Sequence, residues 1–244
     1  MRMRRKETSS SSEFLTNAKY DLNMKDLVPY SWLQKHAEMY SSVSQSDFSD
    51  LKKVDFHFDD PEVGWVDMTI SFDGVAVAEI SLSGIWGSDP VGELLRWTEN
   101  CIHSPEVPHY LYHDGERNDY VFHFESFIFP PVEPKLENGH FCEAGLFSLF
   151  LGDNNGKLVY AVCDIQDFMT NLYNAICDFA ERQKINVTAV RDWAWYIYDQ
   201  KILGRYKEGE VCDDEEDDRL AKKMMLANLR SRKIEKYIQE SKKK

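Results

Sequence analysis

The sequence predicts an α+β domain: a mainly antiparallel sheet of about six strands in three hairpins, with helices packed on it. Two observations predict this class. Segments with alternating apolar residues come in consecutive pairs separated by turn signals, which favours antiparallel pairing. Segments with helical spacing of apolar residues lie between and after these pairs. The expected order is ββαββββαα, within residues 51–204.

The first hairpin is expected on either side of a turn signal, Asp73-Gly74. A two-residue turn there would place Met68 opposite a glutamate and bury its carboxylate. A three-residue loop instead pairs Ile70 with Ala76 and brings the apolar residues onto one face. We predict the three-residue loop, because the buried face determines the register of a hairpin.

A helix is predicted to follow this hairpin. Asp89 is a good N-cap, and Pro90 suits the first helical position. The helix should end before Pro105, because proline cannot continue it. Its inner stripe is expected to consist of Val91, Leu94, Leu95, Thr98 and Ile102.

Two more hairpins are expected after this helix. The second pairs residues 110–112 with 120–124, and the third pairs residues 143–151 with 157–164. The strands of the third hairpin are apolar on both faces. We therefore expect them to lie centrally, with both faces covered.

Two helices are predicted to close the domain. Asp164 caps the first, whose apolar residues keep helical spacing as far as Ala180. The second spans about 188–203. Four large rings crowd it, namely Trp193, Trp195, Tyr196 and Tyr198. These four are candidate partner-binding residues if exposed, because Trp and Tyr are typical interface anchors, and core residues if covered.

Composition divides the chain into four parts. Residues 1–21 are basic and Ser-rich and are expected to be disordered, and residues 22–50 form a short helical arm and linker. Residues 51–204 form the single acidic domain, and residues 205–244 form an acidic-then-basic, partly helical mobile tail. The helix of the arm is expected to start near Pro29 and to carry Trp32, Leu33, His36 and Tyr40.

The net charge of −13 is concentrated in the predicted domain. Residues 51–204 hold 10 Lys and Arg against 25 Asp and Glu, whereas residues 205–244 have a net charge of +2. An acidic surface repels nucleic acid and anionic membranes and attracts basic proteins. No apolar run approaches 18 residues, so no membrane span is expected. Five cysteines without a C-x-x-C spacing favour reduced thiols and a cytoplasmic protein.

The second hairpin carries the best candidate for metal binding or acid–base chemistry. If a five-residue loop, 114–118, closes it, His113 faces Asp119 and His109 faces His123, with opposed Cβ atoms about 5 Å apart. Two imidazoles and a carboxylate at this range can hold a divalent metal or transfer protons. The candidate set is His109, His113, Asp119, His123 and Glu125. The alternative is a solvated strand face.

No motif in the sequence specifies a reaction or a cofactor. We therefore predict a non-enzymatic, cytoplasmic protein-binding module. The working hypothesis resembles an acidic immunity or antitoxin-like inhibitor that meets a basic partner through complementary charge. One alternative is an enzyme or metal-binding protein that uses the His109, His123 and Glu125 strand face. Another is an adaptor that acts through its charged tail.

Overall fold

The computed structural model describes residues 30–62, 65–83, 89–115, 118–127, 133–135, 143–152, 156–183 and 229–242. The elements are α3 (Tyr30–Ser42), β1 (Val54–Phe58), β2 (Trp65–Phe72), β3 (Val75–Ser83), α4 (Pro90–His103), β4 (His109–Asp114), β5 (Asp119–Phe127), β6 (Ala144–Leu151), β7 (Lys157–Asp164), α5 (Ile165–Gln183) and α9 (Arg232–Ser241). The α+β class is confirmed.

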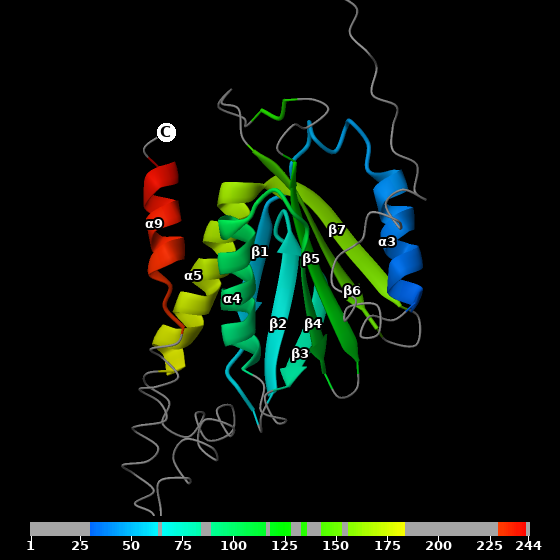
Figure 1. The fold of residues 1–244 in the computed structure, drawn as a ribbon. Helices are drawn as coiled ribbons and strands as arrows, with labels where there is room; N and C mark the ends of the chain where they lie inside the picture. Colours follow the sequence, from blue (N-terminus) through cyan, green and yellow to red (C-terminus); the bar gives the residue numbers. More distant parts are fainter. Residues whose placement is uncertain are drawn as a thin grey trace, which may run out of the picture.

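The prediction of one sheet of about six strands is wrong. The described strands form two antiparallel sheets, one of three strands in the order β1-β2-β3 and one of four in the order β4-β5-β6-β7 (Figure 1). The additional strand is β1, in which Val54 and Phe58 are buried and Asp55 and His57 are not. The sequence shows this alternation, but we did not predict the strand because it is short.

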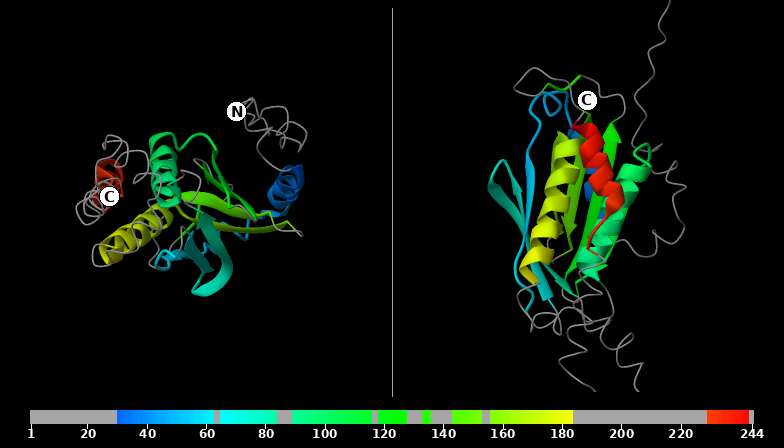
Figure 2. Two further views of the ribbon diagram at one scale, coloured as in Figure 1. Left: turned by 90° about the horizontal axis from the view of Figure 1, so that it is seen from below. Right: turned by 90° about the vertical axis from the view of Figure 1, so that its left-hand side faces the viewer.

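The helices cover the four-stranded sheet from both sides. Helix α3 lies on one face, and α4 and α5 lie on the other, together with the three-stranded sheet (Figures 1 and 2). The main core lies between the two sheets and these two helices. Its largest fully buried side chains include Phe58, Phe122, Phe124, Phe147, Phe168 and Phe179.

The first hairpin buries the predicted face, but its turn and its register differ from the prediction. Asp73 and Gly74 form a two-residue turn, both with positive φ (50° and 78°), which suits the twist of a hairpin. The register then shifts between Ile70 and Ser71, so that Ile70 pairs with Ala78. The extra residue in β3 is a β-bulge, and it restores the common apolar face that we assigned to a three-residue loop.

Capping residues determine where the predicted helices begin. The Asp89 carboxylate accepts the N–H of Gly92 (3.0 Å), and α4 ends at His103, as predicted. The Asp164 carboxylate accepts the N–H of Asp167 (2.8 Å) and caps α5. The predicted second closing helix, about 188–203, lies outside the described residues.

The third hairpin forms as predicted, but only one of its two strands lies centrally in the sheet. Strand β6 is central, and seven of its eight residues are buried. Strand β7 lies at the edge of the sheet instead, next to β6 alone. Helix α3 covers one of its faces and the main core the other, which explains why both faces are apolar.

Both ends of the described chain pack on the domain. Helix α3 begins where the arm helix was predicted and buries Trp32, His36 and Met39 against the four-stranded sheet. At the other end, α9 lies against α4 and α5 (Figure 2), with Leu229 and Ile234 fully buried. We expected the tail, 205–244, to be partly helical, and its described part contains the helix Arg232–Ser241; its mobility stays a prediction.

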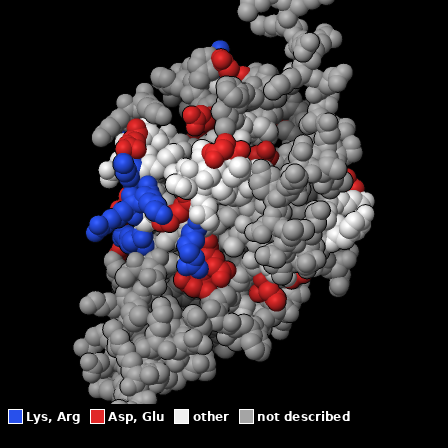
Figure 3. Space-filling model, viewed as in Figure 1, with Lys and Arg blue, Asp and Glu red and all other residues white. Residues whose placement is uncertain are grey.

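The exposed side of α9 is basic. Arg232, Lys233 and Lys236 are exposed there, and basic side chains gather over this helix in Figure 3. Lys233 contacts Glu99 of α4 (3.3 Å), and Arg230 contacts Glu181 of α5 (2.7 Å). The positive charge of the tail is thus held partly against the acidic domain.

Candidate binding site

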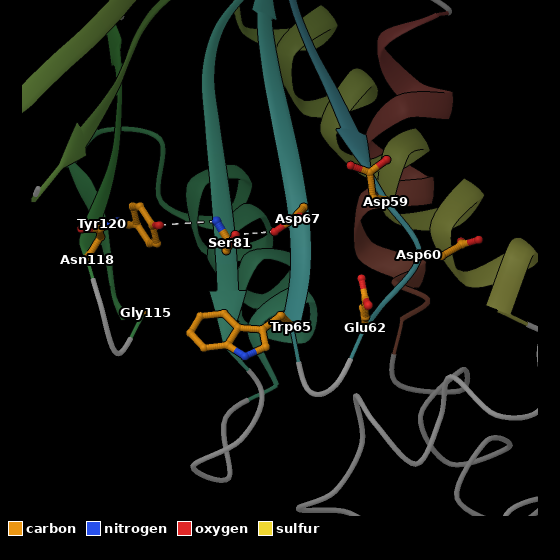
Figure 4. A pocket seen from close by; sticks show the side chains of 9 residues that line it. All are labelled: Asp59, Asp60, Glu62, Trp65, Asp67, Ser81, Gly115, Asn118 and Tyr120. Atoms are coloured by element: carbon orange, nitrogen blue, oxygen red, sulfur yellow. Dashed lines mark hydrogen bonds between the residues drawn. The ribbon is translucent and has the colours of Figure 1, made fainter.

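An acidic hollow lies where the outer side of the three-stranded sheet meets the turn between β4 and β5. Its volume is about 910 Å³. The described residues that line it are Asp59, Asp60, Glu62, Trp65, Asp67, Ser81, Gly115, Asn118 and Tyr120 (Figure 4). Four of these nine side chains are carboxylates, and the described lining contains no Lys, Arg, His or Cys.

Strand alternation places two of the acids and the indole at the hollow. In β2, Val66 and Met68 point into the core, so that Trp65 and Asp67 take the outer face. Asp67 pairs with Ser81 of β3, and the Ser81 hydroxyl donates to its carboxylate. A two-way backbone bridge between Glu62 and Trp65, with both N···O distances 2.9 Å, holds Glu62 at the same end.

The other wall comes from the β4–β5 hairpin. Tyr120 is 4% exposed, and its hydroxyl accepts the backbone N–H of Ser81 (3.4 Å), which joins the two sheets here (Figure 4). Gly115 is packed too closely for any side chain. A Cβ there would lie 2.6 Å from the carbonyl oxygen of Asn118 and 2.8 Å from the Tyr120 ring.

The carboxylates of the hollow are only partly neutralised. Asp60 contacts Arg182 of α5 (3.1 Å) and Asp59 contacts His57 (3.4 Å), and all four side chains are at least 39% exposed. Exposed pairs of this kind contribute little to stability and leave the field largely in place. With Arg182 counted, four carboxylates against one guanidinium leave a local charge of about −3.

This arrangement suits a cationic group. Carboxylates attract an ammonium or guanidinium, and the face of an indole such as Trp65 adds a cation–π contact. The Ser81 hydroxyl, which also lines the hollow, donates to Asp67.

The predicted histidine face does not form. The loop of the second hairpin is one residue shorter than we predicted, because Asp114 pairs with Asp119. His109 then pairs with Phe124, and Tyr110 pairs with His123. The predicted pairs His109–His123 and His113–Asp119 are therefore wrong, because a shift of one residue moves a side chain to the other face.

The five candidates are consequently divided between two faces. His109 and His113 point toward α4: His109 Nε2 donates to the Ser104 carbonyl (2.8 Å), and His113 Nε2 accepts the Ser83 N–H (3.1 Å). Asp119, His123 and Glu125 belong to the opposite face, under α3. In the parts of the chain that the structure describes, no group of three or more His, Cys, Asp or Glu could hold a metal.

His123 instead belongs to a buried polar cluster beneath α3. Its ring lies 4.5 Å from that of His36 and stacks on Tyr110 at 4.8 Å, measured between ring centroids. Its Nδ1 lies 3.3 Å from the Ser148 hydroxyl, and the hydroxyl of Tyr40 donates to Glu125. We call His36, Tyr40, Tyr110, His123, Glu125 and Ser148 the α3 cluster.

Burial determines the ionisation of the α3 cluster. Loss of water lowers the pKa of His36 to about 4 and holds the pKa of His123 well below its usual range. Burial raises the pKa of Glu125. The cluster contains the residue types of a catalytic triad, namely Ser148, His123 and Glu125. However, Ser148 and His123 are both 0% exposed, so a substrate cannot reach them while α3 is docked.

The aromatic candidates and the comparisons add no further site. Trp193, Trp195, Tyr196 and Tyr198 lie outside the described residues, so their exposure stays a prediction. The helices of the described segments include none that is both long and apolar enough to span a membrane. Comparisons of the chain with protein-family models, with curated proteins and with solved structures found no match.

We did not predict the hollow from the sequence. Its signal is the run Asp59-Asp60-Pro61-Glu62, which together with Asp67 places four acids within nine residues. The density of acids is visible in the sequence. The opposing wall is not, because it comes from a hairpin some 50 residues further along the chain.

Proposed function

We propose that the protein is a non-enzymatic, cytoplasmic binding module that captures a basic protein, with an acidic immunity or antitoxin-like inhibitor as the working hypothesis. The observation that carries this proposal is the acidic hollow. The concentration of negative charge in residues 51–204 supports it, because the whole domain then steers the same kind of partner.

The hollow has the right scale for a Lys or Arg side chain with its neighbours. An ammonium about 6 Å from each of three carboxylates gains about 0.7 kcal/mol from each in water, or about 2 kcal/mol together. That corresponds to about 30-fold in affinity, before any contact with the indole of Trp65. Walls that exclude water strengthen the same attraction.

The geometry favours a protein over a small ligand. The hollow is open, and its acids stand at strand ends and loops that a protruding side chain can reach. Binding of one cationic residue there leaves the surrounding acidic surface to contact further basic residues of the partner. Electrostatic matching of this kind contributes mainly to the association rate and to the choice of partner.

A labelled oligolysine peptide tests the proposal directly. The association rate with the full-length protein should fall steeply as salt rises from about 0.01 M to about 0.15 M, because the Debye length shortens from about 30 Å to about 8 Å. The dissociation rate should change less. Substitution Trp65→Ala should raise the dissociation rate, since it removes the short-range contact. An association rate independent of salt would refute the proposal.

A further inference from the structure

We propose that α3 is a pH-sensitive strap, held on the four-stranded sheet by two neutral histidines, His36 and His123, and released when they take up protons. This inference is independent of the acidic hollow. It rests on how α3 is packed and on the groups buried beneath it.

The packing makes α3 separable from the rest of the domain. Its side chains belong to two small hydrophobic clusters on the outer face of the sheet, one around Met39 and Leu146 and the other around Trp32 and Phe150. The main core lies on the opposite face and contains no residue of α3. Release of α3 therefore leaves the main core intact.

The interface contains two imidazoles where most helix–sheet interfaces have apolar side chains. His36 from α3 is 1% exposed and His123 from β5 is 0% exposed, and their ring centroids are 4.5 Å apart. In the docked state, protonation of both would place two like charges side by side without water. Release of α3 exposes both rings and removes this cost.

The sign of the pH effect follows from the direction of the pKa changes. Burial lowers the pKa of both histidines in the docked state, so the released state binds more protons. Docking is thus strongest above the usual histidine pKa of about 6.5 and weakens as the pH falls from there toward about 4, the pKa of docked His36.

The other groups around the two histidines change the size of this pH effect but not its sign. On the same face these groups are Tyr40 of α3, Tyr110 of β4, Glu125 of β5, Ser148 of β6 and Tyr160 of β7, and His109 acts on His123 from the other face of β4. Glu125 opposes the trend, because burial raises its pKa, so that it takes up a proton at a higher pH in the docked state than in the released state. Because two imidazoles oppose one carboxyl group, the histidines determine the sign of the pH dependence of docking.

The size of the change in docking strength with pH depends on the number of histidines that titrate. Between about pH 7.5 and pH 5.5, each histidine that is docked neutral weakens docking about tenfold, so both together weaken it about a hundredfold. Release uncovers an apolar face that includes Val121, Leu146 and Phe150, all at most 1% exposed when α3 is docked.

Hydrogen exchange followed by mass spectrometry on the full chain tests the strap. Protection of α3, corrected for the intrinsic exchange rate, should fall between about tenfold and a hundredfold from pH 7.5 to pH 5.5, while that of α5 stays constant. His36→Gln and His123→Gln should each reduce this pH dependence, and the double variant should abolish it. His57→Gln, at an exposed histidine of β1, is the control and should leave it unchanged.

Two results would overturn the proposal. One is constant protection of α3 across this pH range in the unaltered protein. The other is a parallel loss of protection in α3 and α5, which would indicate unfolding of the whole domain. If the double variant does not fold, the two single variants decide: a pH dependence that is unchanged in both removes the histidines as its cause.

Discussion

Removing the anchor of α9 should release the C-terminal helix without unfolding the domain. Ile234 is 0% exposed, and its helix contacts both α4 and α5. Ser231 caps the helix and donates to Glu99 (2.5 Å), and the Tyr173 hydroxyl donates to Glu235 (2.9 Å). Apolar and polar contacts thus hold the same short helix.

The size of the effect follows from the burial of Ile234. Replacing a buried Ile by Ala costs about 2–5 kcal/mol in a rigid core. A surface helix can shift to fill the space, so we expect about 2–3 kcal/mol for Ile234→Ala. An opening of α9 should then become about 30- to 150-fold more frequent, at about 1.4 kcal/mol per factor of ten.

Limited trypsin digestion of the full chain measures this opening. Arg232, Lys233 and Lys236 lie within α9 and are cut only when the helix opens. At low protease, the cleavage rate follows the open population and should rise by that factor in Ile234→Ala. Gln239→Ala is the matched control, since Gln239 is exposed on the same helix. Equal cleavage rates in the two variants would refute docking of α9 by its apolar face.

The remaining stability predictions concern the main core. Ile70→Asp and Phe168→Asp should each unfold the protein, because both side chains are at most 1% exposed and an unpaired buried charge costs several kcal/mol. His109→Ala should cost only about 1 kcal/mol, the value of its one hydrogen bond, and urea titration distinguishes these outcomes. Gly145→Ala should lower stability by about 1–3 kcal/mol, because its Cβ would lie 2.5 Å from the Phe124 ring; an unchanged urea midpoint would show that the ring moves aside freely.

Features of the fold that depend on neighbouring residues could be predicted from the sequence. Asp89 with Pro90 determines the start of α4, and Asp164 that of α5, because a cap acts within one helical turn. Helix α3 was predicted for the same reason. Alternation in β2 and β3 identified the buried face, since a strand buries every second residue.

Features that depend on distant residues could not be predicted. The bulge in β3, opposite Ile70 and Ser71, and the four-residue loop of the second hairpin each change the register by one residue. The docking of α9 joins Ser231 to Glu99, which are 132 residues apart. No local pattern in the tail indicates such a partner.

The candidate site illustrates the same limit. The overall acidity of the domain predicts a basic partner, but the hollow requires two sheets, and we expected one. Tyr120 lies in the predicted second hairpin, but its hydrogen bond with Ser81, which joins the two sheets, depends on how the sheets pack together. The predicted histidine pairs are wrong because they relied on a single register.

Removal of charge from the hollow tests the central claim most directly. Glu62→Gln with Asp67→Asn removes two carboxylates there, and Glu38→Gln with Asp178→Asn removes two exposed ones from α3 and α5. Both pairs change the net charge equally, so they weaken long-range steering alike. At about 0.02 M salt, loss of about 0.7 kcal/mol per carboxylate should weaken oligolysine binding about tenfold more in the first variant than in the second. Equal affinities in the two variants would contradict a binding site in the hollow.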